Sequence, residues 1–272
     1  MTKQYNELKI TLTNKNFFKM EIDKYAYLRK NKIGQKYITN EGYTIKIVEQ
    51  IRNGIYSVIF EDGTLLRNKQ IGNIVTGKIK NPNHKSVYGV GFLGIGKYKI
   101  SENGNLTKYC NLWIRMIQRC YDIKYRENQP TYKNCSVSEE WHNFQNFSEW
   151  VENNYTEEFA LDKDILQKEN KMYSKETCCF VPAEINNLFT KRKARRGDFP
   201  IGVLKNGNKF KASFSKNKVT TFIGNYNSIE EAFYAYKKEK EKHIKEVAEK
   251  WKDKISKKVY QALINYEVNI ND

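Results

Sequence analysis

Two short polar segments contain the residues of this chain best suited to chemistry on a charged substrate. Asp162, Lys163 and Asp164 follow an apolar run, and Asn186 lies in a later apolar segment. Carboxylate and amide oxygens are ligands that hard cations accept. A charged strand end and a polar helix surface would contain the same residue types, so the surrounding elements decide between the two interpretations.

The hydrophobic pattern predicts the elements that would position these residues. Residues 159–166 and 177–182 predict two strands, with a turn at Asn170-Lys171 between them. Residues 183–189 predict a helix, and Pro182 stands just before it, where proline is tolerated. The expected order is strand, loop, strand, helix, with Asp162 at one end and Asn186 at the other.

This order resembles the ββα-metal module of the HNH endonuclease family, which is found in phages and mobile elements. The matching residues are Leu161-Asp162-Lys163, Cys178-Cys179-Phe180-Val181-Pro182 and Ile185-Asn186-Asn187. The resemblance implies that Asp162 and Asn186 hold one divalent metal, Mg²⁺ or Mn²⁺. It also implies cleavage of phosphodiester bonds, with Asp162 and the residue at position 163 in the catalytic site.

Lys163 stands where the family has the histidine that takes a proton from water. A lysine has an ordinary pKa of about 10.4 and is a poor base, so we expect Lys163 to stabilise charge on the phosphate while the metal activates water. His142 is the nearest histidine in sequence and is the candidate for a base brought to the site by folding. A histidine on a helix face is the alternative.

The C-terminal region predicts a three-stranded sheet covered by a helix. The strands are expected at residues 201–204, 209–215 and 219–224. In the middle strand residues 210, 212 and 214 are apolar and the residues between them are polar, so one face is apolar and the other basic. Ser228 and Glu231 predict a capping box at the start of the helix.

These elements resemble the AP2/ERF DNA-binding domain. The matching residues are Gly202-Val203, Lys209-Phe210-Lys211-Ala212, Phe222-Ile223-Gly224-Asn225-Tyr226 and the run 228–236. In that family the sheet lies in a DNA groove, so the resemblance implies double-stranded DNA as the partner. Here the exposed face contains lysines and no arginine, so we expect phosphate contacts first, from Lys205, Lys209, Lys211, Lys216 and Lys218.

Further basic residues that we expect to contact DNA lie in a linker and on a helix. The linker is the run 191–196, with Lys191, Arg192, Lys193, Arg195 and Arg196; a solvated linker is the alternative. A helix is predicted over 106–125, with an apolar stripe on one side and Arg115 and Arg119 elsewhere around it. A second helix is predicted over 136–154, and its aromatic residues at three-residue spacing are typical of a core.

The N-terminal part predicts a small β module. Strands over 43–48 and 55–60, with turns at Asn53-Gly54 and 61–64, resemble an SH3-like or Tudor-like barrel in pattern and could bind a protein partner.

Residues 85–104 contain the series GVGFLGIG, which lacks the strand-helix context of a nucleotide site. This series therefore favours extended strands or bulges that need glycine.

The chain is thus expected to be an α+β protein of several modules. We place an N-terminal extension at 1–30, the small barrel at 31–82, the HNH-like ββα-metal module with its basic linker at 83–196, and the AP2-like domain with a C-terminal helix at 197–272.

Composition limits the class of partner. The chain has 48 Lys and Arg against 31 Asp and Glu, a net charge of +17, which attracts polyanions through counterion release. We expect no membrane segment, because no apolar stretch is long enough to span a bilayer. The first residues lack the apolar region of a secretory signal, so we expect an intracellular protein. Five cysteines without a CxxC pair in such a chain indicate free thiols. The resemblances imply the cytoplasm of a bacterial or phage-infected cell.

Three hypotheses on function follow. The first is a DNA-binding protein with a divergent HNH-type, metal-dependent endonuclease module. The second is the same architecture without cleavage, acting as a phage regulator or anti-defence factor. The third is an RNA-binding or protein-binding adaptor that uses the N-terminal barrel.

Overall fold

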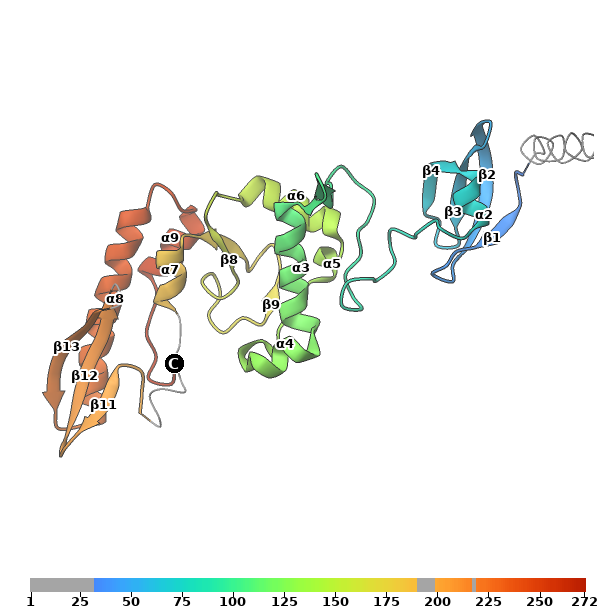
Figure 1. Cartoon of the computed structure of the whole chain (residues 1–272). Helices are drawn as coiled ribbons and strands as arrows, with labels where there is room; N and C mark the ends of the chain where they lie inside the picture. The colour runs from blue at the N-terminus through green and yellow to red at the C-terminus, as the bar shows by residue number, and fades with distance from the viewer. Residues whose placement is uncertain (1–31, 190–198, 217–218) are drawn as a thin grey trace, which may run out of the picture. The chain divides into compact units, whose positions relative to one another are not determined.

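The computed structural model describes residues 32–189, 199–216 and 219–272, which form several small sheets and flanking helices (Figure 1). The α+β class expected from the sequence is therefore confirmed. The chain divides into two compact units after His84. The expected extension 1–30, the basic run 191–196, the boundary near 197 and Lys218 lie outside the described residues.

The first unit contains an antiparallel sheet with strand order β1-β2-β3-β4 and one short helix. The elements are β1 (Lys36–Ile38), β2 (Thr44–Arg52), β3 (Ile55–Phe60), β4 (Leu65–Gln70) and α2 (Ile71–Val75). The expected turn at Asn53-Gly54 joins β2 to β3, with a φ of 72° at Gly54. Ile45, Ile47, Tyr56 and Ile74 are fully buried, because α2 packs on the sheet.

This sheet does not close into the barrel that the sequence predicted. Among the described residues β1 pairs only with β2 and β4 only with β3, so both outer strands are edges. The physical reason is that β1 is only three residues long and that a helix follows β4 where another strand would be needed. The small barrel is corrected to an open four-stranded sheet.

The first half of the second unit is mostly helical and packs around aromatic residues. Its elements are β5 (Ser101–Glu102), β6 (Asn105–Leu106), α3 (Lys108–Tyr121), α4 (Ile123–Asn128), the 3₁₀ helix η1 (Pro130–Tyr132), β7 (Ser136–Val137), α5 (Glu139–His142) and α6 (Phe144–Asn154). The helix expected over 136–154 is interrupted at Asn143, whose side chain caps α6. Trp141, Phe144 and Phe147 are buried and Trp150 packs against them, as predicted.

The glycine series lies against the helices of this half. A Cβ on Gly94 would come within 2.2 Å of the Asn143 side chain, and one on Gly96 within 2.3 Å of Gln145 Oε1. The Gln145 amide donates to the carbonyls of Leu93 and Tyr98, and its oxygen accepts the Tyr98 N–H. Glycine is therefore needed for close approach of the loop to α6. The segment forms a loop with two isolated bridges and not the extended strands that were predicted.

The region with the HNH-like residues forms a minimal ββα arrangement. Its elements are β8 (Ala160–Asp162), β9 (Met172–Tyr173), β10 (Cys179–Val181) and α7 (Ala183–Leu188), and α7 begins after Pro182 as expected. β8 and β10 pair antiparallel, whereas β9 pairs in parallel with β7. The two strands are shorter than predicted, and β9 was not predicted.

The C-terminal part contains the expected three-stranded sheet and its helix. The elements are β11 (Val203–Asn206), β12 (Lys209–Lys216), β13 (Val219–Tyr226), α8 (Ile229–Trp251) and α9 (Lys257–Ile264), and the strand order is β11-β12-β13. The capping box of Ser228 and Glu231 is confirmed. Val203 and Ala212 are buried with Phe233 and Tyr236 of α8, so the helix covers one face of the sheet (Figure 1).

One hydrophobic cluster joins the ββα arrangement to the C-terminal helices. Val181 of β10 and Ile185 of α7 are fully buried in it together with Ile244 of α8 and Val259 of α9. The elements on the two sides of the predicted boundary near residue 197 therefore share a core within the second unit.

Candidate nucleic-acid interface and candidate metal site

The strand β8, the strand β10 and the helix α7 place Asp162 and Asn186 in one small arrangement. Asp162 is the last residue of β8 and lies opposite Cys179 of β10. α7 packs against β8, and Asn186 is half-buried in the middle of α7. The predicted order of strand, loop, strand and helix is present, with the additional short strand β9 inside the loop.

The Asp162 carboxylate holds the start of the loop that follows β8. Its Oδ1 accepts the N–H groups of Asp164 at 2.7 Å and of Ile165 at 2.9 Å. Burial raises the pKa of the Asp162 carboxyl above its ordinary value, although these two N–H donors oppose the shift. Its other oxygen accepts no hydrogen bond from a described residue, so one carboxylate oxygen remains available to a cation.

The Lys163 side chain forms hydrogen bonds within the same loop. Its side chain is only 7% exposed, and its Nζ donates to Asp164 Oδ1 at 2.6 Å and to the Asn170 carbonyl at 2.9 Å. Both bonds tie the ammonium group to residues of this loop. Lys163 therefore closes the loop after β8, and its geometry does not provide a base.

His142 lies at the end of α5, among residues of the aromatic core. Its Nε2 is 3.2 Å from the Tyr121 hydroxyl, and burial lowers the pKa of the His142 imidazole, with a smaller contribution from Lys85. None of the interactions of His142 within the described chain involves Asp162 or Asn186. The structure therefore does not bring this candidate base to the candidate metal ligands.

The ligand set for a metal is small. Within residues 32–189, 199–216 and 219–272, no group of three or more His, Cys, Asp or Glu side chains is arranged to hold a metal ion. Mg²⁺ commonly keeps several waters and takes only one or two protein oxygens. Asp162 and Asn186 carry the types of oxygen that such a cation accepts.

Arg115 and Arg119, the two arginines of α3, differ in how far their side chains are packed against other residues. The Arg119 guanidinium lies 5.8 Å from the Tyr132 ring and also interacts with Tyr173, so it is packed against aromatic residues. Arg115 is exposed on α3. Of this pair, Arg115 is the one that a phosphate could reach without displacing a packed side chain.

The face of the β11–β13 sheet opposite α8 has polar, basic and apolar residues in rows across the strands. Leu204, Lys211 and Asn225 form one row, and Asn206 with Lys209 forms the next. The Asn206 amide donates to Asn225 Oδ1 at 3.1 Å, and Lys211 Nζ lies 5.5 Å from the Phe222 ring. None of the three strands contains Asp or Glu.

Phe222 reaches this face through an irregularity in β13. The pairing of β12 with β13 shifts between Ala212 and Ser213, which leaves Ile223 without a partner. Ile223 and Gly224 then both turn to the helix side, and Phe222 pairs with Ser213 on the opposite face, where it is 55% exposed. Because a bulge adds one residue to the strand, the side chains before it and those after it follow opposite alternation. Phe222 therefore does not share a face with Gly224 and Tyr226.

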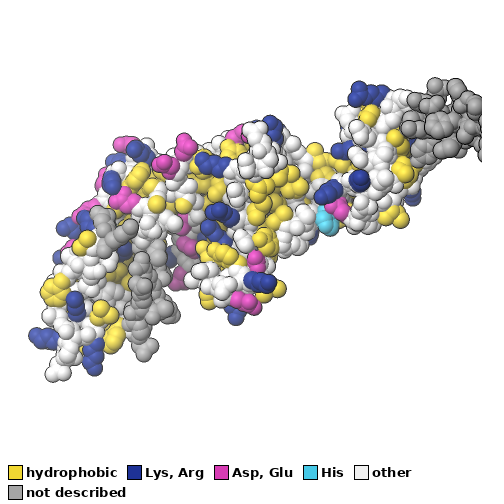
Figure 2. All heavy atoms as spheres, viewed as in Figure 1, with side chains coloured by type: hydrophobic (Ala, Val, Ile, Leu, Met, Phe, Trp, Pro, Cys, Tyr) yellow, Lys and Arg dark blue, Asp and Glu magenta, His cyan; other side chains and the backbone are white. Residues whose placement is uncertain are grey.

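The other predicted lysines lie elsewhere. Lys205 pairs with Phe210, which belongs to the helix side of the sheet. Lys216 Nζ forms an ion pair at 2.9 Å with Glu246 of α8. Lys209 and Lys211 therefore lie on the open face as predicted, and Lys205 and Lys216 do not. Figure 2 shows dark blue and yellow side chains together at the lower end of this sheet.

Prediction from the sequence did not single out four residues of the open face: Leu204, Asn206, Phe222 and Asn225. Strict alternation from Val203 and Lys209 would have indicated Leu204 and Asn206. Phe222 could not be found in this way, because the bulge changes the alternation in β13.

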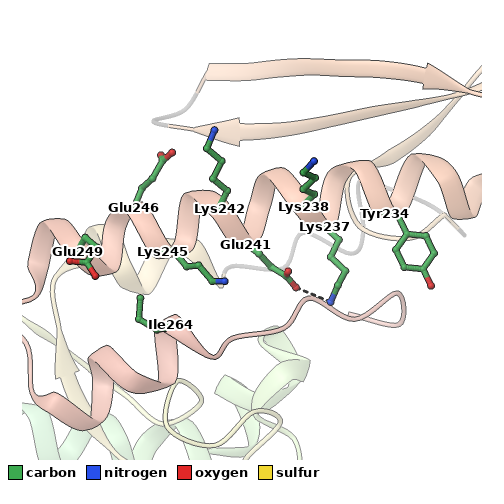
Figure 3. A pocket seen from close by; sticks show the side chains of 9 residues that line it. All are labelled: Tyr234, Lys237, Lys238, Glu241, Lys242, Lys245, Glu246, Glu249 and Ile264. Atoms are coloured by element: carbon green, nitrogen blue, oxygen red, sulfur yellow. Dashed lines mark ion pairs between the residues drawn. The ribbon is translucent and has the colours of Figure 1, made fainter.

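A groove of about 940 Å³ runs along α8 and is lined by residues of this helix together with Ile264 of α9 (Figure 3). Four lysines and three glutamates line it: Lys237, Lys238, Lys242, Lys245, Glu241, Glu246 and Glu249. Lys237 pairs with Glu241 at 2.8 Å, and Glu246 pairs with Lys216. The carboxylates offset the lysines, so this groove is a weaker anion site than the open sheet face.

Comparisons of the chain with models of protein families, with curated proteins and with solved structures found no significant match. None of the helices in the described residues is long and apolar enough to cross a membrane.

Proposed function

We propose that this protein binds double-stranded DNA through the open face of the β11–β13 sheet. The observation that carries the proposal is the composition of that face, where Lys209 and Lys211 lie beside two amides and no carboxylate is present on the strands. The side chains of α8 cover the other face of the sheet.

The shape of the sheet and the charge of the chain support this proposal. A two- or three-stranded antiparallel ribbon fits the major groove, which is about 12 Å wide. Lysines contact phosphates and set the orientation of the protein on the duplex, whereas amides can contact base edges. The net charge of +17 adds attraction that does not depend on sequence. The AP2-like resemblance leads to the same partner.

The test is the salt dependence of duplex binding by the full chain. We expect log K to fall steeply with log salt, and Lys209→Ala and Lys211→Ala each to reduce that slope by about 1. Lys238→Ala, which removes an exposed lysine of α8, is the matched control and should leave the slope nearly unchanged. A flat salt response of the wild-type chain would contradict the proposal.

The second candidate function is metal-dependent cleavage of DNA by the HNH-like module. The specific observation in its favour is the β8–β10–α7 arrangement, in which one Asp162 carboxylate oxygen has no donor among the described residues and Asn186 lies on the adjacent helix. A bound Mg²⁺ or Mn²⁺ would supply Lewis acidity and an activated water. Lys163 and His142 are not placed to act as bases, so this proposal ranks below binding alone.

Incubation of the full chain with supercoiled plasmid and Mg²⁺ or Mn²⁺ separates cleavage from binding. Nicking that is lost in both Asp162→Ala and Asn186→Ala would establish the nuclease. No nicking with either metal, together with intact duplex binding, would leave a DNA-binding protein that acts as a regulator or anti-defence factor.

We also propose the finer architecture and cellular setting that the resemblances imply. The β1–β4 sheet would be a module for a protein partner, the β8–β10–α7 region an HNH-like module, and the β11–β13 sheet with α8 an AP2-like module. Ile38 of β1, which is 72% exposed, supports a contact surface on the first module. The setting would be the cytoplasm of a bacterial or phage-infected cell.

A further inference from the structure

We infer that the open face of β11–β13 reads A·T base pairs, with Phe222 and Leu204 contacting thymine methyl groups and Asn206 contacting adenine. This inference rests on the proposed function, since it assumes that the face enters the major groove. It goes further by assigning a base preference and the residues that set it.

The first step is the exposure of two large apolar side chains on this face. Phe222 is 55% exposed and Leu204 is 45% exposed, on the two outer strands of the sheet. The side chains of a solvated sheet face are normally polar, because burial of apolar area gains about 25 cal/mol per Å². Two apolar residues on a face with no acidic residue indicate a partner that offers apolar groups together with negative charge.

The second step is how Phe222 comes to lie there. The bulge at Ile223 turns Phe222 away from α8, although a regular strand would have directed it into the core with Gly224 and Tyr226. Bulges often re-aim a side chain next to a functional site. The fold thus leaves in solvent a phenyl ring that could have been buried.

The third step is the chemistry of the groove edge. In the major groove an A·T pair presents the thymine methyl group, the adenine N7 acceptor and the adenine N6 donor, whereas a G·C pair has no methyl group. Phe222 and Leu204 match the methyl group. The side chains on this face include no arginine, the commonest partner of guanine.

The fourth step is the state of the amides. Asn206 donates one N–H to Asn225 Oδ1 at 3.1 Å, which fixes its side chain across β12 between Lys209 and Lys211. Neither its own oxygen nor its second N–H has a hydrogen-bond partner among the described residues, and these two groups are the acceptor and donor pair that adenine requires. Asn206 is therefore held in an orientation suited to adenine without using the atoms that would contact it.

The experiment compares three duplexes of equal length with the full chain at one salt concentration: alternating dA-dT, the same duplex with deoxyuridine in place of thymidine, and alternating dG-dC. Deoxyuridine removes only the methyl group. A methyl group contributes about 0.8 kcal/mol when buried, which is about a 4-fold change in affinity. We expect the wild-type chain to bind dA-dT about 4-fold or more tightly than dA-dU, and dG-dC more weakly still.

Variants assign the preference to residues. Phe222→Ala should reduce the dA-dT to dA-dU ratio toward 1, and Asn206→Ala should reduce the preference over dG-dC while leaving the methyl effect. Tyr234→Ala is the matched control, because Tyr234 is an aromatic residue 65% exposed on α8 rather than on the sheet. Circular dichroism checks that each variant is folded.

The outcomes separate this inference from the proposed function. Equal binding of dA-dT and dA-dU by a chain that still binds duplexes in a salt-dependent way overturns the inference alone. Absence of duplex binding overturns both. Tighter binding to a single strand of equal length that cannot pair with itself, lost in Phe222→Ala, would make Phe222 a stacking platform for unpaired bases and would also overturn the A·T reading.

Discussion

At the scale of single residues, burial decides what Lys163 can do. In the resembled family this position supplies a base, whereas here the ammonium group is buried and bonded to Asp164 and the Asn170 carbonyl. The sequence alone allowed a role in charge stabilisation at a phosphate. Burial opposes that role, because the ammonium group would have to break two bonds to leave the loop.

This position of Lys163 predicts a loss of stability when it is replaced. We expect Lys163→Met to lower the free energy of unfolding by about 1–3 kcal/mol, because a buried carbonyl and a carboxylate lose their donor. Lys171→Met, at an exposed lysine of the same loop, should change it by less than about 0.5 kcal/mol. Urea denaturation measures both, and equal stability of the Lys163→Met and wild-type chains would count against a structural role.

At the scale of elements, the β11–β13 sheet depends on one glycine at its start. Gly202 has a φ of +81°, and a Cβ there would come within 2.0 Å of the Tyr236 ring of α8. The close contact lets β11 lie directly on the helix, with Val203 buried behind it. Gly207, in the turn between β11 and β12, also has a positive φ but open space around it.

These two glycines give a matched pair of variants. Gly202→Ala should cost about 2 kcal/mol or more, because it combines a left-handed backbone with a clash against an aromatic ring. Gly207→Ala should cost about 1 kcal/mol, from the backbone alone. Thermal unfolding compares them. A cost at Gly202 no larger than at Gly207 would show that the contact with Tyr236 does not constrain the sheet.

At the scale of the whole molecule, the C-terminal residues join α8 to the loop after β8 within the second unit. Lys168 Nζ lies 2.9 Å from Asp272 Oδ1, whose side chain is only 4% exposed, and donates to the Glu267 carbonyl at 3.1 Å. Glu241 of α8 accepts the Val268 N–H at 2.8 Å. The loop that contains Lys163 is therefore coupled to the helix that supports the sheet.

Removal of the Lys168 contacts should destabilise the loop after β8 and the C-terminal residues together. We expect Lys168→Met to cost about 1–3 kcal/mol and to speed hydrogen exchange in residues 163–172 and 266–272 alike. Lys175→Met removes an ion pair of 2.8 Å with Glu140 in which both side chains are about half exposed, and should cost less than about 1 kcal/mol. Faster exchange in only one of the two segments would show that they open independently.

The sequence by itself determined most of the local structure. The strand-loop-strand-helix order around Asp162 and Asn186, the capping box at Ser228 and the alternation in β12 follow from short-range patterns, and the structure contains all three. Such features depend on neighbouring residues and on hydrogen bonds to the adjacent backbone, so they can be inferred without knowing the fold.

Only the tertiary structure decided which side chains are exposed on the open sheet face and which are buried. The exposure of Phe222 depends on a bulge set by the pairing of β12 with β13, and the burial of Lys163 depends on a loop that closes through Asn170. Closure of the first sheet depends on whether its edge strands meet, and they do not. Each result depends on contacts between distant residues, which composition and spacing do not specify.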